Sequence, residues 1–94
     1  MASFNEEEEA AFLLGVRVPC VSSNVAAAWY EPDQENGTLY IEFDGKGSPN
    51  TVYWWYGQSY DVARSFARAG SKGRWCWEVY NWPNVRYDGK FTLG

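Results

Sequence analysis

Two kinds of side chain in this sequence could combine to bind a ligand. Aromatic rings gather in Tyr53–Gly57, which reads Y-W-W-Y-G, and again at Trp75 and Trp77. Cationic residues lie between and beside these rings. Rings stack on flat bases and cations pair with phosphate, so the combination predicts a site for a nucleotide-type anion. Its candidate residues are Tyr53, Trp55, Arg64, Arg68, Lys72, Arg74, Trp75 and Trp77.

Three small polar side chains extend the candidate site: Ser22, Ser23 and Asn24. They could hydrogen-bond to phosphate or ribose, or they could satisfy backbone groups where a strand begins. The other features have structural alternatives too. The cations could form a solvated helix face, and the rings of Tyr53–Tyr56 could be buried on both sides of a strand. A ring face exposed to water would instead indicate a binding surface.

The sequence offers little for catalysis. It contains no histidine, which removes the commonest general base and the Ser-His-Asp and Cys-His nucleophile sets. Cys20 and Cys76 have no recognisable base, form no C-x-x-C motif, and are expected to be reduced thiols of a cytoplasmic protein. The loop Gly70–Gly73 lacks the G-x-x-x-x-G-K-[ST] spacing of a P-loop. We therefore expect a binding protein and not an enzyme, with no metal and no cofactor.

Length and charge limit the partners. A chain of 94 residues with 46% apolar residues predicts one domain, 1–94, with one modest core. No apolar run reaches membrane-spanning length, and Glu6–Glu9 stand where a secretory signal would carry basic residues. The net charge is −4, yet residues 1–44 hold nine acids and one base, and residues 45–94 hold seven bases and three acids. An anionic ligand would favour the second half, whereas the overall charge opposes a long duplex nucleic acid.

Two segments have the pattern of helices. A short helix is predicted from about Asn5 to Leu14, because Asn5 can cap it and acidic residues fill its first turn. A second helix is predicted over Ser59–Ala69, with Ser59 or Asp61 as its cap and Gly70 at its end.

The remaining segments favour strands, and together they predict an α+β fold. The expected strands are Val21–Tyr30, Thr38–Phe43, Thr51–Tyr56 and Arg74–Tyr80, with Val85–Phe91 as a last short strand or a tail. The sheet is expected to be a small antiparallel meander of three to five strands, with the Ser59–Ala69 helix packed on one face and the N-terminal helix added. In the third strand, Tyr53 and Trp55 share one face, and Trp54 and Tyr56 share the other. Which pair faces water stays open.

From Val21 to Tyr87 the order of residues resembles the KTSC domain family. Its matching pieces are Ser22–Val25, Thr38–Phe43, Tyr53–Gly57 at the family's Y-x-Y pattern, Ala69–Trp75 at its A-x-S-x-G-x-[YF] stretch, and Val85–Tyr87 near its closing I-R segment. Residues 1–20 form an extension outside this pattern, and Arg17–Cys20 replace the K-T-S-C lead. The family is a small module of some lysyl-tRNA synthetases and of free-standing bacterial or phage proteins. RNA binding has been supposed for it.

The leading functional prediction is non-enzymatic binding of a small nucleotide-type anion. The chain's size and the family resemblance suggest a phage accessory protein that sequesters a host nucleotide signal. One alternative is a protein–protein inhibitor of a host factor, which would use the acidic residues of Glu6–Glu9 and Glu31–Glu35. Another is single-stranded RNA binding. An exposed strand edge and surplus rings would also suit a homodimer.

Overall fold

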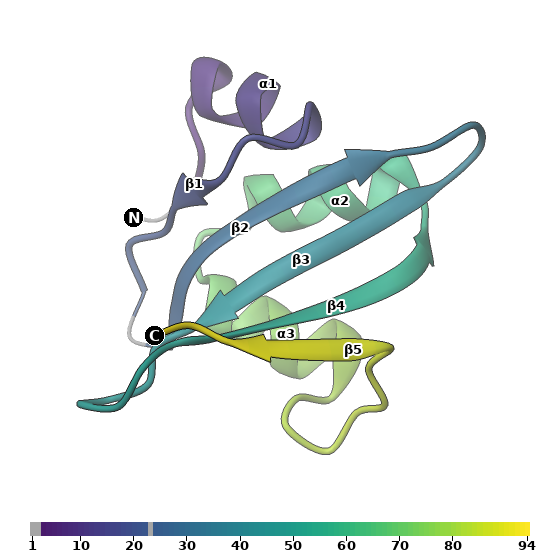
Figure 1. Cartoon of the computed structure of the whole chain (residues 1–94). Helices are drawn as coiled ribbons and strands as arrows, with labels where there is room; N and C mark the ends of the chain where they lie inside the picture. Colours follow the sequence, from purple (N-terminus) through teal and green to yellow (C-terminus); the bar gives the residue numbers. More distant parts are fainter. Residues whose placement is uncertain (1–2, 23) are drawn as a thin grey trace.

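The computed structural model describes residues 3–22 and 24–94, so Ser23 of the predicted site lies outside the described residues. Its elements in chain order are α1 (Glu6–Leu13), β1 (Val18–Pro19), β2 (Val25–Pro32), β3 (Gly37–Phe43), β4 (Thr51–Gln58), α2 (Tyr60–Arg68), α3 (Lys72–Tyr80) and β5 (Gly89–Thr92) (Figure 1). The five strands form one antiparallel sheet in the order β1-β2-β3-β4-β5. The α+β class and the meander are therefore confirmed.

The predicted helix caps are present. The Asn5 Oδ1 accepts a hydrogen bond from the Glu8 backbone N–H at 2.8 Å, and the Glu8 Oε1 accepts one from the Asn5 N–H at 2.9 Å. This reciprocal pair satisfies two backbone donors that the start of α1 would otherwise leave free. At α2 the Ser59 hydroxyl accepts from the Val62 N–H at 3.1 Å, so Ser59 is the cap and Asp61 is not.

The strand predicted over Arg74–Tyr80 is wrong, because this segment lies in α3. The Ser71 hydroxyl caps the helix by accepting from the Arg74 N–H at 3.2 Å. Its buried residues are Lys72, Trp75 and Cys76, which have the i, i+3, i+4 spacing of one helix face. The alternation of Trp75, Trp77 and Val79 was misleading because Trp77 and Val79 are exposed.

The ends of the sheet also differ from the prediction. The two-residue strand β1 was not predicted; Val18 pairs with Ala28, and Pro19, which cannot donate to a ladder, sits on this edge. Strand β4 continues past Gly57 to Gln58. Of the last strand predicted as one alternative over Val85–Phe91, the structure has the part from Gly89 onward, as β5, which pairs with β4 as the opposite edge.

One face of the sheet is covered and the other is not. In Figure 1 helices α2 and α3 lie behind the sheet, and the face turned to the viewer carries no helix. The covered side holds the core, in which Phe12 stacks on Phe66 at a centroid distance of 5.6 Å. Strand β4 follows the predicted alternation: Trp55 is buried in that core beside Leu39, whereas Trp54 pairs with Tyr40 on the uncovered side. Hence Trp54 and Tyr56 are the pair that faces away from the helices.

Candidate functional site

A row of three rings crosses the uncovered side of the sheet, which we call the open face. Trp29 of β2 stacks on Tyr40 of β3 at 5.0 Å with 9° between the ring planes, and Tyr40 meets Trp54 of β4 at 5.8 Å. The strand register sets this row, because Trp29 pairs with Tyr40 and Tyr40 pairs with Trp54. All three rings remain partly exposed. The row is therefore an aromatic platform and not a core.

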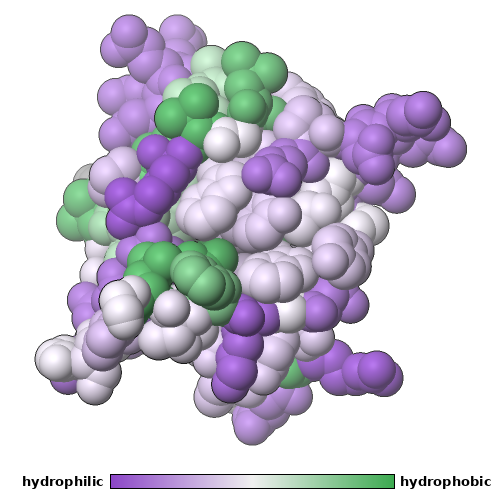
Figure 2. Space-filling model, viewed as in Figure 1, coloured by the Kyte–Doolittle hydropathy of each residue, from purple (hydrophilic) through white to green (hydrophobic). Residues whose placement is uncertain are grey.

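A hollow of about 410 Å³ lies on this platform. Its lining is entirely apolar or aromatic: Trp29, Tyr40, Val52, Trp54, Phe91 and Leu93. Phe91 is 60% exposed, as is Tyr56 beside the row. Figure 2 shows the open face as a pale field with a green apolar patch, surrounded by purple hydrophilic groups. A contiguous exposed apolar surface of this kind typically marks an interaction site.

Gly89 holds the Trp54 ring in place. The indole lies against the backbone of β5, so a Cβ built on Gly89 would come within 2.1 Å of the Trp54 Cζ2. A residue with a side chain would therefore displace the ring. The platform thus depends on a glycine two residues before Phe91 in the neighbouring strand.

One end of the open face carries a closed polar network. The Arg17 Nε and Nη2 donate to the two carboxylate oxygens of Glu42 at 2.9 and 3.0 Å, and the Asn50 Nδ2 donates to Glu42 at 2.8 Å. Arg17 holds the pKa of Glu42 below its usual value, chiefly through these hydrogen bonds. Glu42 is only 2% exposed. This network neutralises the carboxylate and supports the sheet.

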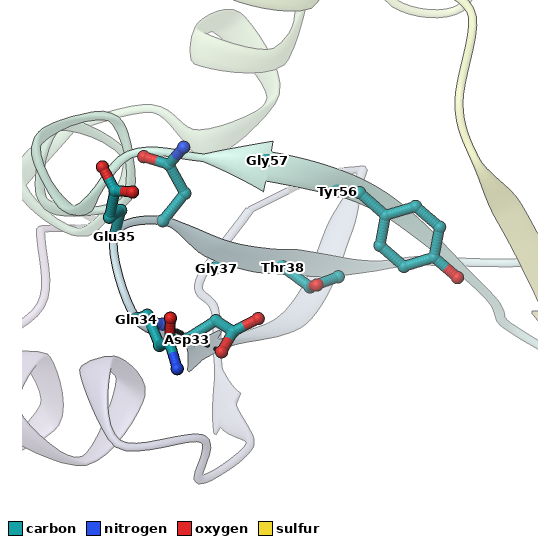
Figure 3. A pocket seen from close by; sticks show the side chains of 8 residues that line it. Asp33, Gln34, Glu35, Gly37, Thr38, Tyr56 and Gly57 are labelled. Atoms are coloured by element: carbon teal, nitrogen blue, oxygen red, sulfur yellow. Dashed lines mark hydrogen bonds between the residues drawn. The ribbon is translucent and has the colours of Figure 1, made fainter.

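The other end of the open face is acidic. The Tyr40 hydroxyl donates to the Glu31 Oε1 at 3.2 Å, and burial together with this carboxylate raises the pKa of Tyr40. Beyond it, the β2–β3 hairpin forms a second hollow of about 480 Å³, lined by Asp33, Gln34, Glu35, Asn36, Gly37, Thr38, Tyr56 and Gly57. Figure 3 shows Thr38 between Tyr56 and the turn residues. Thr38 lies two residues before Tyr40 on β3, so the acidic hairpin adjoins the ring row.

The predicted cations do not form a free basic patch. Arg68 makes a two-pronged contact with Glu9 at 3.0 and 3.1 Å, and Arg64 approaches the same carboxylate at 4.0 Å. Arg74 pairs with Glu78 at 2.9 Å. Glu9 and Glu78 thus offset two of these three positive charges, which were expected to attract an anion.

Lys72 is the fourth predicted cation, and it is completely buried. Its Nζ donates to the backbone carbonyls of Ala67 and Ala69 at 2.9 and 2.8 Å and lies over the rings of Phe4 and Phe66. Burial lowers its pKa to about 8. Lys72 therefore joins α2 to α3 and does not present a charge to solvent.

Most of the predicted rings and polar groups likewise have a structural role, through burial or internal hydrogen bonds. Trp55 and Trp75 are 4% and 7% exposed, and the Trp75 Nε1 donates to the Ser65 hydroxyl at 2.7 Å. Trp77 is 56% exposed on α3, where Val79 is exposed as well. The Ser22 hydroxyl accepts from the backbone N–H groups of Asn24 and Val25, both at 3.4 Å. Ser22 therefore satisfies backbone groups where β2 begins, which was the alternative to ligand binding.

The structure does bring two predicted residues together elsewhere. Asn24 and Tyr53 help to line a hollow of about 340 Å³, with Phe43, Asp44, Gly45, Lys46, Thr51 and Trp82. In its wall Phe43 stacks on Trp82 at 4.2 Å. The platform residues Trp29, Tyr40 and Trp54 were not predicted as a site. The alternation of Tyr53–Tyr56 separated the two faces of β4, and the predicted site used Tyr53 and Trp55, on the face that the helices cover.

Other site chemistries find no support in the described residues. In residues 3–22 and 24–94, no cluster of cysteine, aspartate and glutamate is placed to hold a metal. Burial raises the pKa of the Cys20 thiol to about 11 and that of Cys76 to about 12, so neither is poised as a thiolate. None of the described helices is long and apolar enough to cross a bilayer.

A solved structure shares this fold. A KTSC domain protein from Yersinia pestis superposes with a TM-score of 0.58 and 28% sequence identity, over 83% of this chain and 96% of its own. No protein-family model and no curated protein sequence matches the chain. The resemblance to the KTSC family is thus confirmed at the level of the fold. The name of the neighbour states no ligand and no activity.

Proposed function

We propose that the protein is a non-enzymatic binding module that takes a segment of a partner polypeptide on the open face. The observation that carries this proposal is the exposed ring row of Trp29, Tyr40 and Trp54, with an apolar hollow beside it. Aromatic side chains are enriched at the centres of protein interfaces because they bury a large area at a low entropic cost. The acidic hairpin predicted as a protein-binding region adjoins this row.

A polypeptide suits this surface better than a compact ligand. The open face offers two neighbouring hollows of different chemistry, one apolar and one acidic and amide-lined. Tyr56 and Thr38 of the acidic hollow lie beside the row that lines the apolar one. An extended segment can place every second side chain in these hollows, because its side chains point alternately toward and away from the open face.

Replacing Trp54 by alanine tests the proposal. Peptides are first selected from a displayed random library on the wild-type protein, and their affinities are then measured by fluorescence anisotropy. We expect Trp54→Ala to weaken the selected peptides by about tenfold or more, because a central interface tryptophan is a typical hot spot. Trp77→Ala is the matched control, since Trp77 is an exposed tryptophan on α3, away from the open face.

Circular dichroism should show that both variants remain folded, because neither ring belongs to the buried core. The proposal fails if the library yields no binder. It fails equally if the binders tolerate Trp54→Ala as well as they tolerate Trp77→Ala.

A nucleotide-type anion is the second candidate ligand. The hollow that joins Asn24 and Tyr53 supports it, because stacked rings and the Lys46 side chain are features that suit a nucleotide. We expect calorimetry with a panel of mononucleotides and cyclic dinucleotides to detect binding if this candidate is right, and Lys46→Gln to weaken it several-fold. Arg74→Gln is the control cation, since Arg74 lies on α3 and does not line this hollow. A panel without measurable heat would remove this candidate and leave the open-face proposal standing.

A further inference from the structure

We infer that the segment bound by the open face is basic, with arginine side chains lying on the ring row. This inference rests on the proposed function and adds the chemistry of the partner. Acidic residues lie on and beside the platform, and the carboxylate of Glu31 lies next to the rings.

Among the described residues, the strand register places two charged side chains on the strands of the open face, because Lys90 of β5 pairs with Tyr53 and so lies on the other face. These are Glu31 of β2, two residues after Trp29, and Glu42 of β3, two residues after Tyr40. Arg17 neutralises Glu42, whereas Glu31 is exposed. Asp88 adds a third acid near the rings, since its Oδ2 accepts from the Tyr56 N–H at 2.8 Å. The face is therefore negative around an apolar centre.

The hairpin beside the row strengthens this field. Asp33 and Glu35 are exposed and line the hollow that Tyr56 closes at its other end (Figure 3). In the described part of the chain, no ion pair involves Glu31, Asp33 or Glu35. These carboxylates thus have their charge available for a cation of the partner.

Rings and carboxylates together select a guanidinium group. A cation is attracted to the face of tryptophan or tyrosine, and arginine does this most often because its planar group also stacks. The Glu31 Oε1 lies 3.2 Å from the Tyr40 hydroxyl, so an arginine over this end of the row would meet a carboxylate at the ring edge. Arginine is also suited to two-pronged pairing with a carboxylate. The aliphatic part of its side chain could cover the apolar hollow.

The same charges disfavour two other occupants. A second copy of the chain would bring two acidic faces together, which costs free energy. A nucleic acid would bring its phosphates against the same carboxylates, in a protein whose net charge is −4.

Short labelled peptides of alternating arginine and serine provide the test, with glutamine–serine and glutamate–serine peptides of equal length for comparison. We expect the arginine peptide to bind and the other two not to bind, as measured by fluorescence anisotropy. Binding should weaken as salt is raised, because the pairs are exposed. Trp54→Ala should weaken it by about tenfold, and Gly89→Ala, which displaces the Trp54 ring but keeps it, should also weaken it.

Charge variants test whether the acidic end of the open face, and not another acidic part of the surface, binds the arginine peptide. We expect Glu31→Gln to weaken the arginine peptide by up to about fivefold, and addition of Asp33→Asn and Glu35→Gln to weaken it further. The control is Glu7→Gln, because Glu7 is an exposed acid in the first turn of α1. It should leave the affinity unchanged unless binding is due to net charge alone.

Three results would overturn the inference. The first is equal binding of the glutamine–serine peptide, the second is an equal effect of Glu7→Gln and Glu31→Gln, and the third is a dimer in sedimentation that Trp54→Ala dissociates. A failure of the inference differs from a failure of the proposed function. If library peptides bind through Trp54 but contain no arginine or lysine, the partner chemistry is wrong and the open face remains the binding surface.

Discussion

Replacing Phe66 by alanine is expected to lower the free energy of unfolding by about 3–5 kcal/mol. Phe66 is fully buried in α2 and contacts the rings of Phe4, Phe12 and Trp75 at centroid distances of 6.3, 5.6 and 5.1 Å. The substitution removes a phenyl ring and leaves a cavity that the surrounding rings cannot fill. Since small domains are stable by only about 5–15 kcal/mol, this loss is a large fraction of the total.

Urea unfolding followed by circular dichroism measures the effect. The matched control is Phe91→Ala, because Phe91 is the same residue type but is 60% exposed on β5. We expect Phe91→Ala to cost about 1 kcal/mol or less. Similar costs for the two variants would show that Phe66 does not hold α1, α2 and α3 together as the ring contacts indicate.

Replacing Glu42 by glutamine is expected to lower the free energy of unfolding by about 2–3 kcal/mol. The Glu42 carboxylate accepts three hydrogen bonds, two from Arg17 and one from Asn50. Glutamine has one acceptor oxygen, so its NH₂ group must face at least one of these donors. The Asn50 amide cannot simply turn over, because its Oδ1 accepts from the Gly45 N–H at 2.9 Å.

The same residue predicts how stability depends on pH. In the folded protein the hydrogen bonds from Arg17 and Asn50 lower the pKa of Glu42 below 4.5, although burial opposes them. The carboxylate therefore stabilises the fold above pH 4.5, and this contribution is lost as the pH falls through the lowered pKa. Wild-type protein should lose stability on acidification more steeply than Glu42→Gln.

The exposed acid Glu7 again provides the control, since Glu7→Gln also removes one carboxylate but lies in the first turn of α1, outside the Glu42 network, and should cost less stability than Glu42→Gln. Glu9, whose pKa is also lowered by its hydrogen bond from Arg68, is present in every variant, so the difference between curves isolates Glu42. Parallel acid unfolding curves for wild type and Glu42→Gln would contradict the prediction.

Local signals in the sequence predicted most of the fold. The caps at Asn5 and Ser59 are interactions between residues three apart, so the identity of a few neighbours suffices to find them. The alternation in Thr38–Phe43 and Thr51–Tyr56 depends only on the two-residue period of a strand. The α3 error has the same origin, because the alternation of Trp75, Trp77 and Val79 also fits the two-residue period of a strand. The buried face of α3 instead includes Lys72. Its carbonyl partners Ala67 and Ala69 and the rings of Phe4 and Phe66 allow it to be buried.

The candidate site could not be found in the same way. The sequence shows that Tyr53 and Trp55 face one way and Trp54 and Tyr56 the other, but not which face the helices cover. That choice depends on the docking of α1, α2 and α3 on the Trp55 side. Likewise, the spacing of Arg64 and Arg68 places them on one helix face but does not reveal Glu9, which is 59 residues away from Arg68.

The spacing of residues along the chain thus established the helices α1 and α2, the antiparallel strands β3 and β4 and the two faces of β4. Folding determined which rings meet water and which charges are already paired. The physical reason is the separation along the chain between the residues that interact. A cap or an alternating strand is an interaction among near neighbours, whereas the ring row joins Trp29, Tyr40 and Trp54 from three strands, and Arg68 meets Glu9 only after the chain has folded.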